Sequence, residues 1–512
     1  MMRRAARGLA GLVMVVLAAV GLTACAPDRV AGWMPAQWPV EGHVLDALPA
    51  SGSGEAAGVG MRVRNDDVGI DARWEYLPGE QPVNAAIEAH VRSLIGMREA
   101  ASGVGYRPRV FAAGAGLDQR GCDTEHTQRT GTEILGERSG TVVVCEITLA
   151  RGSVFAETLR AVTGAGGVIE NDTATTIYTD LSTGAVGTGA DLFADPAPLW
   201  SAMIEVLRRD AGSLSIRPVA APDEEQLVML RTAVAAATLV GGEVILPVPT
   251  ALRAAELDGL SAWSGRAPDR STFVAIDADA VAGALSPLGR AVADAVGPFT
   301  GPESAGAAYD RTPCDLVPCM AMTLDDGPST LTPGFLDVLQ QQQSAATFFM
   351  LGQNAQRHPD IVRRVAAEGH EIGNHTWNHP YLTELSDASI RAQLNGTRDL
   401  LQQLSGQAVG TFRPPGGFVD DRVLAVAAEP AIMWSVDTRD WAGPDDATLR
   451  SYAIDTPQVG TIMLMHDIQA VSSRVFGDIV AGLRDRGFSL VTVEHLFGGS
   501  IPGGLVRHGP VP

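Results

Sequence analysis

The sequence predicts an α/β domain in the C-terminal part of the chain, preceded by a separate α+β domain. From Cys319 onward, short apolar runs that suit strands alternate with amphipathic runs that suit helices, and this order favours βα units around a parallel sheet. Between residues 61 and 297, strand-like and helix-like runs follow each other in a mixed order. The parallel sheet is either doubly wound or closed into a barrel, and in both cases chemistry is expected at the strand ends.

The first residues have the layout of an export signal. Arginines at positions 3, 4 and 7 precede an apolar run over 9–22, which is short for a membrane span. The run ends in "LTAC", which resembles the bacterial lipobox, where the cysteine (here Cys25) becomes the lipidated first residue. We therefore expect a lipoprotein signal peptide over 1–25 and a lipid anchor on the outer face of the cell membrane. Simple secretion and an uncleaved anchor helix are the alternatives.

Composition divides the rest of the chain. Residues 26–60 are rich in Pro, Gly, Ala and Ser, which predicts a flexible tether. The α+β domain follows over 61–297, with strand-like runs such as "GTVVVCEITLA" and helix-like runs such as "PLWSAMIEVLRRD". A loop-like linker over 298–313 leads to the α/β domain over 314–500, and residues 501–512 are a tail.

The length of the chain indicates how many domains it has, and its net charge argues against one class of partner. A chain of 512 residues exceeds one ordinary core, so two or three domains are expected. The 38 Lys and Arg stand against 59 Asp and Glu, which gives a net charge of −21. Such a charge would repel phosphates and argues against nucleic acid as a partner.

Four cysteines remain after Cys25 is assigned to the anchor. An exported protein folds in an oxidising environment, which favours disulfides. Local pairing of Cys122 with Cys145 and of Cys314 with Cys319 is the natural guess. A metal site built from these thiols is the alternative, but "CDLVPC" has no second pair at zinc-ribbon spacing.

Polar side chains stand at the ends of several predicted strands of the α/β domain. Asp325 and Asp326 end one strand in "MTLDDGPST". Arg413 and His466 close two others, in "TFRPPGG" and "TIMLMHD". Groups that end different strands of one sheet converge on one rim, which makes these residues candidates for a shared site.

The motif "HTWNH" follows a further predicted strand and contains His375 and His379. One turn of helix at this i, i+4 spacing would point both imidazoles the same way, which suits a shared metal. Taken alone such a pair is a weak signal, because solvated or core histidines are common. The strand-end residues around it strengthen the metal interpretation.

The order of these motifs resembles the polysaccharide deacetylases, carbohydrate esterase family 4 with the NodB homology domain. Its five signatures appear in sequence as "TLDDGP", "HTWNH", "RPPGG", "DTRDW" and "LMH", over about 314–497. The resemblance implies a distorted (β/α) barrel that removes acetyl groups from glycans with a divalent metal, usually zinc. The five signatures together are highly specific for this family, although no single one of them is.

The resemblance implies roles for the residues that carry it. Asp326, His375 and His379 would be the metal ligands, Asp325 the general base, and Arg413 the residue that orients Asp325. A metal with open positions polarises the carbonyl of an amide and activates water, while a carboxylate accepts the water proton.

Further positions would complete the site. His466 would be the general acid with Asp440 as its support, and Trp441 and Leu464 would line a pocket for the acetyl methyl group. The backbone N–H of Gly416 would help to hold the oxyanion.

The chain departs from the family pattern at two positions. Leu324 stands where the family usually has Phe, a swap that should repack without abolishing the site. Gly416 stands where an aromatic residue, usually Tyr, follows "RPP". Glycine can still donate its N–H but removes an aromatic wall, so a reduced rate or a wider groove is expected.

The N-terminal half carries a weaker resemblance. The stretches "TTIYTDLSTGAVGTGADLF" and "STFVAIDADAVAGALSPLG" are similar to the extracellular domain of RsiV-type lysozyme-sensing anti-sigma factors. This similarity suggests an accessory domain over 61–297 that binds glycan or protein.

These features lead to one expectation and two alternatives. We expect a membrane-anchored deacetylase of N-acetylated cell-wall amino sugars, with peptidoglycan as the substrate. The alternatives are a deacetylase of another glycan, such as a chitooligosaccharide or an O-acetylated polysaccharide, and a binding or sensing lipoprotein whose site is vestigial.

Overall fold

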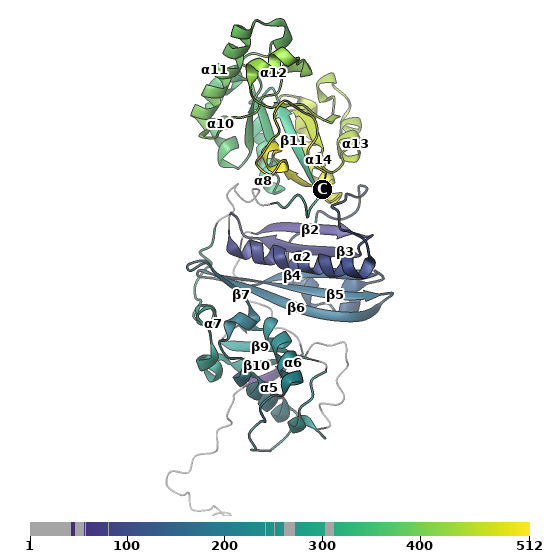
Figure 1. Ribbon diagram of the computed structural model, residues 1–512, viewed down its shortest axis with the longest axis vertical. Coiled ribbons are helices and arrows are strands. Elements are labelled where there is room, and N and C mark those ends of the chain that lie inside the picture. Colours follow the sequence, from purple (N-terminus) through teal and green to yellow (C-terminus); the bar gives the residue numbers. More distant parts are fainter. Residues whose placement is uncertain are drawn as a thin grey trace, which may run out of the picture. The chain divides into compact units, whose positions relative to one another are not determined.

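The structure is a computed structural model of the chain (Figure 1). It describes residues 42–46, 56, 58–79, 81–240, 242–249, 251–260, 272–302 and 312–511. The predicted signal peptide with Cys25, and most of the predicted tether and linker, lie outside the described residues. Among the helices in these ranges, none is long and apolar enough to cross a membrane.

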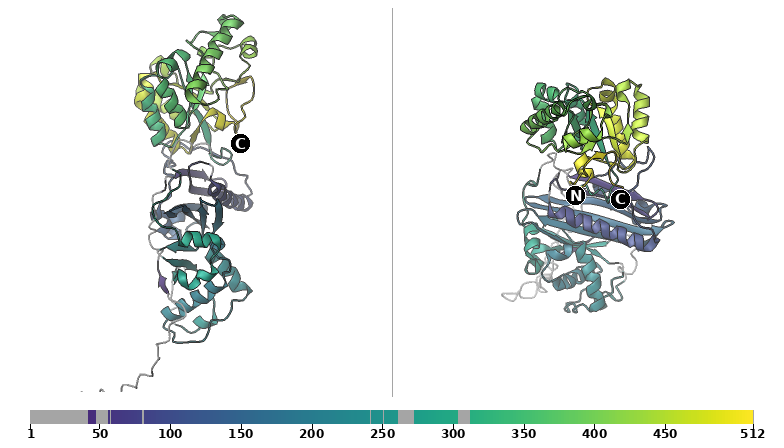
Figure 2. Two further views of the ribbon diagram at one scale, coloured as in Figure 1. Left: turned by 90° about the vertical axis from the view of Figure 1, so that its left-hand side faces the viewer. Right: turned by 45° about the horizontal axis from the view of Figure 1, so that its top comes forward.

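A six-stranded sheet with one long helix begins the predicted α+β domain (Figures 1 and 2). In order across the sheet, its strands are β2 (Val59–Asn65), β3 (Ile70–Tyr76), β4 (Gly140–Arg151), β5 (Val154–Ala165), β6 (Val168–Asp180) and β7 (Ala185–Thr188). Neighbouring strands are antiparallel except β3 and β4, which are parallel. The predicted strand "GTVVVCEITLA" lies within β4.

Helix α2 (Pro82–Ser102) lies across one face of this sheet (Figure 2). Its buried residues include Val83, Ile87 and Val91, which are spaced one helical turn apart and form an apolar stripe. The helix ends at Gly103, whose left-handed backbone is typical of a helix C-cap. Two short helices, α3 (Thr124–Gln128) and α4 (Gly131–Leu135), precede β4.

A second, four-stranded antiparallel sheet follows. In order across the sheet, its strands are β1 (Gly42–Leu45), β10 (Thr272–Asp277), β9 (Glu243–Val248) and β8 (Thr238–Val240). The helices of this region are α5 (Ala197–Asp210), α6 (Glu224–Ala235) and α7 (Pro287–Ala293). The predicted helix "PLWSAMIEVLRRD" lies in α5, so the α+β character is confirmed, although it is built from two sheets.

Strand β1 corrects the predicted tether. The range 26–60 was expected to be flexible throughout, but Val44 and Leu45 pair with Val274 and Phe273 of β10. The extended segment 42–45 satisfies the backbone hydrogen-bonding groups at the open edge of β10. A segment rich in Gly and Ser has a lower preference for strands and would pair with this edge less well. The tether prediction is therefore wrong at 42–45, and also at 59–60, where β2 begins.

The C-terminal domain is built around a parallel sheet. Across the sheet its strands are β13 (Glu371–Asn374), β12 (Thr347–Met350), β11 (Cys319–Asp325), β16 (Ile462–His466) and β15 (Val436–Asp437), with β17 (Ser489–Val491) also paired to β11. Every one of these pairs is parallel. All seven residues of β11 are buried, which explains why its sequence is a nearly continuous apolar run.

Helices connect these parallel strands. They are α8 (Thr332–Gln341), α9 (Gly352–Arg357), α10 (Pro359–Ala367), α11 (Asp387–Ser405), α12 (Asp421–Ala427), α13 (Asp446–Asp455), α14 (Ala470–Asp485) and α15 (Val493–Leu496). Beyond β13 the sheet continues through a bridge at Phe412 to β14 (Ala431–Ile432) and β18 (Leu505–Val506). The predicted α/β class with a distorted (β/α) barrel is confirmed.

The strand predicted at "TFRPP" is reduced to that single bridge. Phe412 pairs with Asn374 and Ala431, but Pro414 and Pro415 follow at once. Proline has no backbone N–H to offer a neighbouring strand, so the pairing stops there. Arg413 is consequently held at the edge of the sheet, in an irregular segment.

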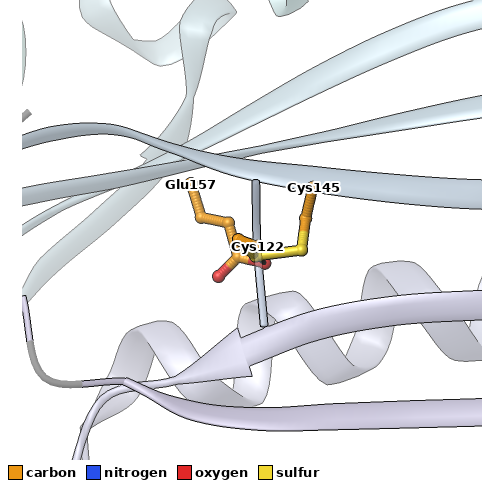
Figure 3. A group of neighbouring side chains, drawn as sticks. All are labelled: Cys122, Cys145 and Glu157. Carbon is orange, nitrogen blue, oxygen red and sulfur yellow. Dashed lines mark hydrogen bonds between the residues drawn. A yellow bond between two sulfur atoms is a disulfide. The ribbon is translucent and has the colours of Figure 1, made fainter. Parts of the chain in front are cut away.

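Both predicted disulfides are present. Cys122 is bonded to Cys145 of β4, and Cys314 is bonded to Cys319 at the start of β11. The alternative of a metal site made from these thiols is therefore wrong. Figure 3 shows that the first disulfide lies beside Glu157 of β5.

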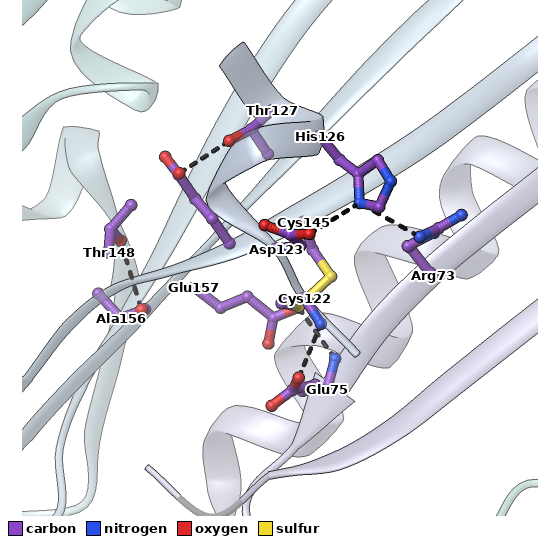
Figure 4. The surroundings of a disulfide bond; sticks show 11 residues. Arg73, Glu75, Cys122, Asp123, His126, Thr127, Cys145, Thr148, Ala156 and Glu157 are labelled. Carbon is purple, nitrogen blue, oxygen red and sulfur yellow. Dashed lines mark hydrogen bonds and ion pairs between the residues drawn. A yellow bond between two sulfur atoms is a disulfide. The ribbon is translucent and has the colours of Figure 1, made fainter. Parts of the chain in front are cut away.

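Glu157 is a buried carboxyl group beside the Cys122–Cys145 disulfide, with Glu75 close by (Figure 4). Its Oε1 accepts a hydrogen bond from the N–H of Glu75 at 3.1 Å and lies 3.4 Å from Cys122 Sγ. Its Oε2 has no hydrogen-bond partner among the described residues. Burial raises the pKa of Glu157 well above its usual value, and the nearby charge of Glu75 adds to this effect.

Replacing Glu157 by glutamine is expected to stabilise the protein at alkaline pH. Because folding raises the pKa of Glu157, its protonated form favours the fold, and stability falls as pH rises above the unfolded pKa of about 4.3. Glutamine keeps the acceptor for Glu75 and does not titrate. We expect the variant's Tm to exceed the wild-type Tm at pH 8 by about 2–4 °C, the shift that roughly 1 kcal/mol produces in a domain of this size, and to match it near pH 4.

Thermal unfolding monitored from pH 4 to 8 checks this expectation. Glu125→Gln, on exposed α3, is the matched control and should change Tm little. A Tm difference for Glu157→Gln that is the same at both ends of the pH range would show that packing and not charge is responsible.

Candidate metal centre

Two adjacent carboxylates end β11, and they face different partners. Asp325 is buried, and its Oδ1 lies 2.7 Å from Arg413 Nη1. Asp326 follows with a φ of 72°, in the left-handed region, and its Oδ1 lies 3.4 Å from His375 Nε2. The turn in the backbone at Asp326 thus separates two like charges that the sequence places side by side.

Arg413 is completely buried and holds Asp325 in place. Its Nη1 donates to Asp325 Oδ1 and, at 2.6 Å, to Thr323 Oγ1. Its Nε and Nη2 donate to the carbonyl oxygens of Ile432 and Met433 at 2.8 and 3.0 Å. Since several donors of the guanidinium are bonded at once, the ion pair has a fixed geometry.

Asp326, His375 and His379 form a three-ligand group. The Nε2 atoms of His375 and His379 lie 3.4 and 3.5 Å from the same Oδ1 of Asp326. One ligand atom from each residue lies within 4.8 Å of the other two. The predicted ligands are thus brought together.

The group fits a divalent cation. Asp326 Oδ1 is buried, yet it has no hydrogen-bond partner in the described part of the chain. His375 Nδ1 lies 2.8 Å from the carbonyl oxygen of Arg413 and donates its proton there, which leaves a lone pair on Nε2. Two imidazoles and one carboxylate are a donor set that zinc accepts at catalytic sites.

Charge at the site also favours an anionic ligand at Asp326. Burial alone would raise the pKa of Asp326, but His375, His379 and His466 outweigh burial and lower it to about 2. Burial lowers the pKa of His379 below its usual value. Both shifts favour the deprotonated forms that metals bind.

The helical turn predicted for "HTWNH" is wrong. The segment 375–379 is a loop after β13, with positive φ at Thr376 and His379. The N–H of Thr376 donates to Asn374 Oδ1, and the N–H of His379 donates to Thr376 Oγ1. These local side-chain bonds replace the helical pattern, yet they still bring the rings of His375 and His379 to a centroid distance of 5.1 Å.

His466 ends β16 directly beside the end of β11. It pairs in register with Asp325, and its Nδ1 lies 2.7 Å from Asp440 Oδ1. Asp440 Oδ2 accepts from the backbone N–H of His466 at 2.8 Å and from Ser472 Oγ at 2.5 Å. The buried carboxylate of Asp440 therefore fixes both the ring and the backbone of His466.

The same contacts keep the imidazole of His466 protonated. Burial would lower the pKa of His466, but the hydrogen bond and charge of Asp440, together with Asp325 and Asp326, raise it to about 9. Because the folded-state value lies above the usual 6.5, the stabilisation is complete below about pH 6.5 and is lost as pH rises through about 9. The site thus holds a proton donor at neutral pH.

Changing Asp440 to asparagine is expected to lower the pKa of His466 from about 9 toward its usual value of about 6.5. The amide keeps the shape of the side chain but removes the charge that favours imidazolium. A titration of the histidine ring protons by NMR in metal-free protein measures the change. Asp437→Asn, in nearby β15, should leave the titration unaltered, and a pKa that stays near 9 in Asp440→Asn would refute this role.

Gly416 has a conformation that favours glycine. Its φ is 64°, and a Cβ built there would lie 3.0 Å from ring atoms of Tyr381 and of Phe418. Leu324, the other departure from the family pattern, is buried in the core of the domain. Both residues are therefore accommodated by their surroundings.

The acetyl pocket expected around Trp441 and Leu464 stays a prediction. Leu464 is buried on β16, whereas 57% of Trp441 is exposed next to Asp440. An exposed indole beside the buried carboxylate suits a wall that a substrate covers on binding.

Two supporting residues were not predicted. Thr323 accepts from Arg413 and donates to the carbonyl of Met463. It stands two residues before Asp325, so the two-residue period of a strand placed it on the same face and could have revealed it. Ser472, which donates to Asp440, lies at the start of α14 and carries no such spacing signal.

The C-terminal part of the chain is similar to known proteins. A family model described as polysaccharide deacetylase matches residues 314–432. The chain is 36% identical over 180 residues to the peptidoglycan-N-acetylglucosamine deacetylase PgdA of Listeria monocytogenes, which covers 35% of this chain and 39% of that protein. It therefore spans only about two fifths of the length of this relative.

Two shorter relatives are covered more fully. The chain is 37% identical over 186 residues to a peptidoglycan-N-acetylglucosamine deacetylase of Bacillus cereus, which covers 35% of this chain and 87% of that protein. It is 34% identical over 151 residues to a chitooligosaccharide deacetylase of Azorhizobium caulinodans, over 28% of this chain and 72% of that protein. With its five signatures and these relatives, the chain belongs to the polysaccharide deacetylase family.

Proposed function

We propose that the protein is a metal-dependent hydrolase that removes N-acetyl groups from the amino sugars of peptidoglycan. The observation that carries this proposal is the register of β11 and β16, whose last residues are Asp325 and His466. One is a carboxylate paired with an arginine, and the other is an imidazole that keeps its proton. A group that can accept a proton and a group that can donate one thus stand side by side next to one metal-ligand group.

The residues of the site have complementary roles in hydrolysis. A divalent cation bound by Asp326, His375 and His379 would polarise the acetyl carbonyl and activate a water molecule. Asp325 Oδ2, which lies 3.7 Å from His375 Nε2 on the metal side, accepts the proton of the attacking water. His466 gives its proton to the amine nitrogen as the C–N bond breaks, and acetate and a free amine result.

Zinc is our choice of metal, and the anchor is part of the proposal. The two imidazoles and one carboxylate support zinc. The Arg-rich start, the apolar run and the "LTAC" sequence support a lipid anchor at Cys25 on the outer face of the membrane. Peptidoglycan is the polymer that a protein anchored there would meet, and two of the relatives are named for it.

Acetate release tests the proposal. Purified peptidoglycan, chitooligosaccharide and acetylated xylan are each incubated with the protein before and after removal of metal by a chelator. We expect release from peptidoglycan that falls to background on chelation and returns with zinc. Faster release from another polymer would favour the other-glycan alternative, which the Azorhizobium relative supports. A protein that binds zinc but releases no acetate would favour a vestigial site.

A further inference from the structure

Two aromatic rings stand exposed near the metal centre. Tyr381 is 45% exposed and Phe418 is 52% exposed, and their ring centroids are 4.8 Å apart. We call this pair the aromatic shelf. Exposed aromatic rings leave apolar surface in contact with water. A pair of such rings at the edge of a site therefore indicates a binding surface.

The shelf lies on the two segments that also build the metal centre. Tyr381 comes two residues after His379, and Phe418 comes five residues after Arg413. The same segments are joined at the metal centre, where His375 Nδ1 donates to the carbonyl oxygen of Arg413. The shelf is therefore placed beside the ligand loop.

Gly416 fits this arrangement. Its missing Cβ would lie 3.0 Å from Tyr381 Cε1 and from Phe418 Cδ2. A Cβ at 416 would press on both rings, which would have to give by a few tenths of an ångström, so the two rings pack closely over this position. The aromatic surface that the family pattern leads one to expect at 416 is thus supplied by Tyr381 and Phe418.

We propose that the aromatic shelf binds the pyranose ring of a glycan next to the sugar whose acetyl group is removed. This inference rests on the proposed function. A pyranose has a face of C–H groups that packs on aromatic rings, and a polar rim that the hydroxyl of Tyr381 can contact. Tyr and Phe have few rotatable bonds, so ordering them on binding costs little entropy. An acetyl group alone gains nothing from the shelf, which therefore favours oligosaccharides.

Two alanine variants and two substrates test the shelf. We expect Tyr381→Ala and Phe418→Ala each to lower kcat/KM for chitopentaose about tenfold, the effect of roughly 1.4 kcal/mol, mainly through a higher KM. Hydrolysis of a small aryl acetate, which has no sugar, should fall several-fold less. Tyr381→Phe keeps the ring and should retain most of the wild-type kcat/KM for chitopentaose.

The matched control is Tyr452→Ala in α13, since Tyr452 is 45% exposed like Tyr381 and lies outside the site. It should leave both reactions unchanged. Equal losses on both substrates in Tyr381→Ala would mean that the ring only supports the ligand loop, and no loss on either would mean that no sugar binds there. Both results overturn the shelf.

Calorimetric binding of chitopentaose to the Asp325→Asn protein separates this inference from the proposed function. If wild type releases no acetate but Tyr381→Ala still weakens binding about tenfold, the proposed function fails and the shelf stands. If wild type does release acetate and neither binding nor KM responds to the shelf variants, the shelf fails and the proposed function stands.

Discussion

Replacing Asp325 by asparagine is expected to lower kcat/KM for acetate release by about 10²- to 10⁴-fold, the usual contribution of a general base. Asparagine has the same size and can still accept from Arg413 through Oδ1, but it cannot take a proton from water. The residues of the metal group are unchanged, so bound zinc should stay at the wild-type level. Acetate assays and elemental analysis of the purified variant measure the two quantities.

Asp326→Asn is the matched variant, because it makes the same chemical change one residue further along. It should lose both zinc and activity. Activity that persists in Asp325→Asn would refute the role of Asp325 as base. Loss of zinc from Asp325→Asn as complete as from Asp326→Asn would show instead that both carboxylates bind the metal.

Replacing Arg413 by methionine is expected to reduce the free energy of unfolding of the α/β domain by about 3–5 kcal/mol. Methionine is apolar and of similar length, so Asp325 would remain buried without its charge partner. The carbonyl oxygens of Ile432 and Met433 would also lose their donors. Urea unfolding monitored by tryptophan fluorescence gives the free energy.

Arg363→Met is the control for this prediction. Arg363 forms an exposed ion pair with Asp360, and its loss should cost less than about 1 kcal/mol. A second test adds Asp325→Leu to Arg413→Met, which removes both buried charges and should recover part of the stability. Equal costs for Arg413→Met and Arg363→Met would mean that burial of the Arg413 pair does not matter.

Features with a local cause were predictable from the sequence. Strand β11 could be recognised because burial on both faces requires a nearly continuous apolar run, and Asp325 and Asp326 mark its end. The disulfides were predictable since short separations allow local pairing. The motif order predicted the three residues of the candidate metal group.

Features with a distant cause were not predictable. The "HTWNH" segment has helical spacing, yet the N–H of Trp377 donates to Gln393 Oε1 from α11, and this contact helps to hold a loop. Ser472, near the start of α14, donates to Asp440, which lies 32 residues earlier in the chain. Such contacts depend on the packing of elements that are far apart in the chain.

Arg413 contacts both halves of the centre through different atoms. Its carbonyl oxygen accepts from His375, a proposed metal ligand, and its guanidinium holds Asp325, the proposed base. The covalent skeleton of one buried residue therefore fixes the distance between ligand and base. The centre is preorganised before any glycan arrives, so the energy of substrate binding does not have to be used to assemble it.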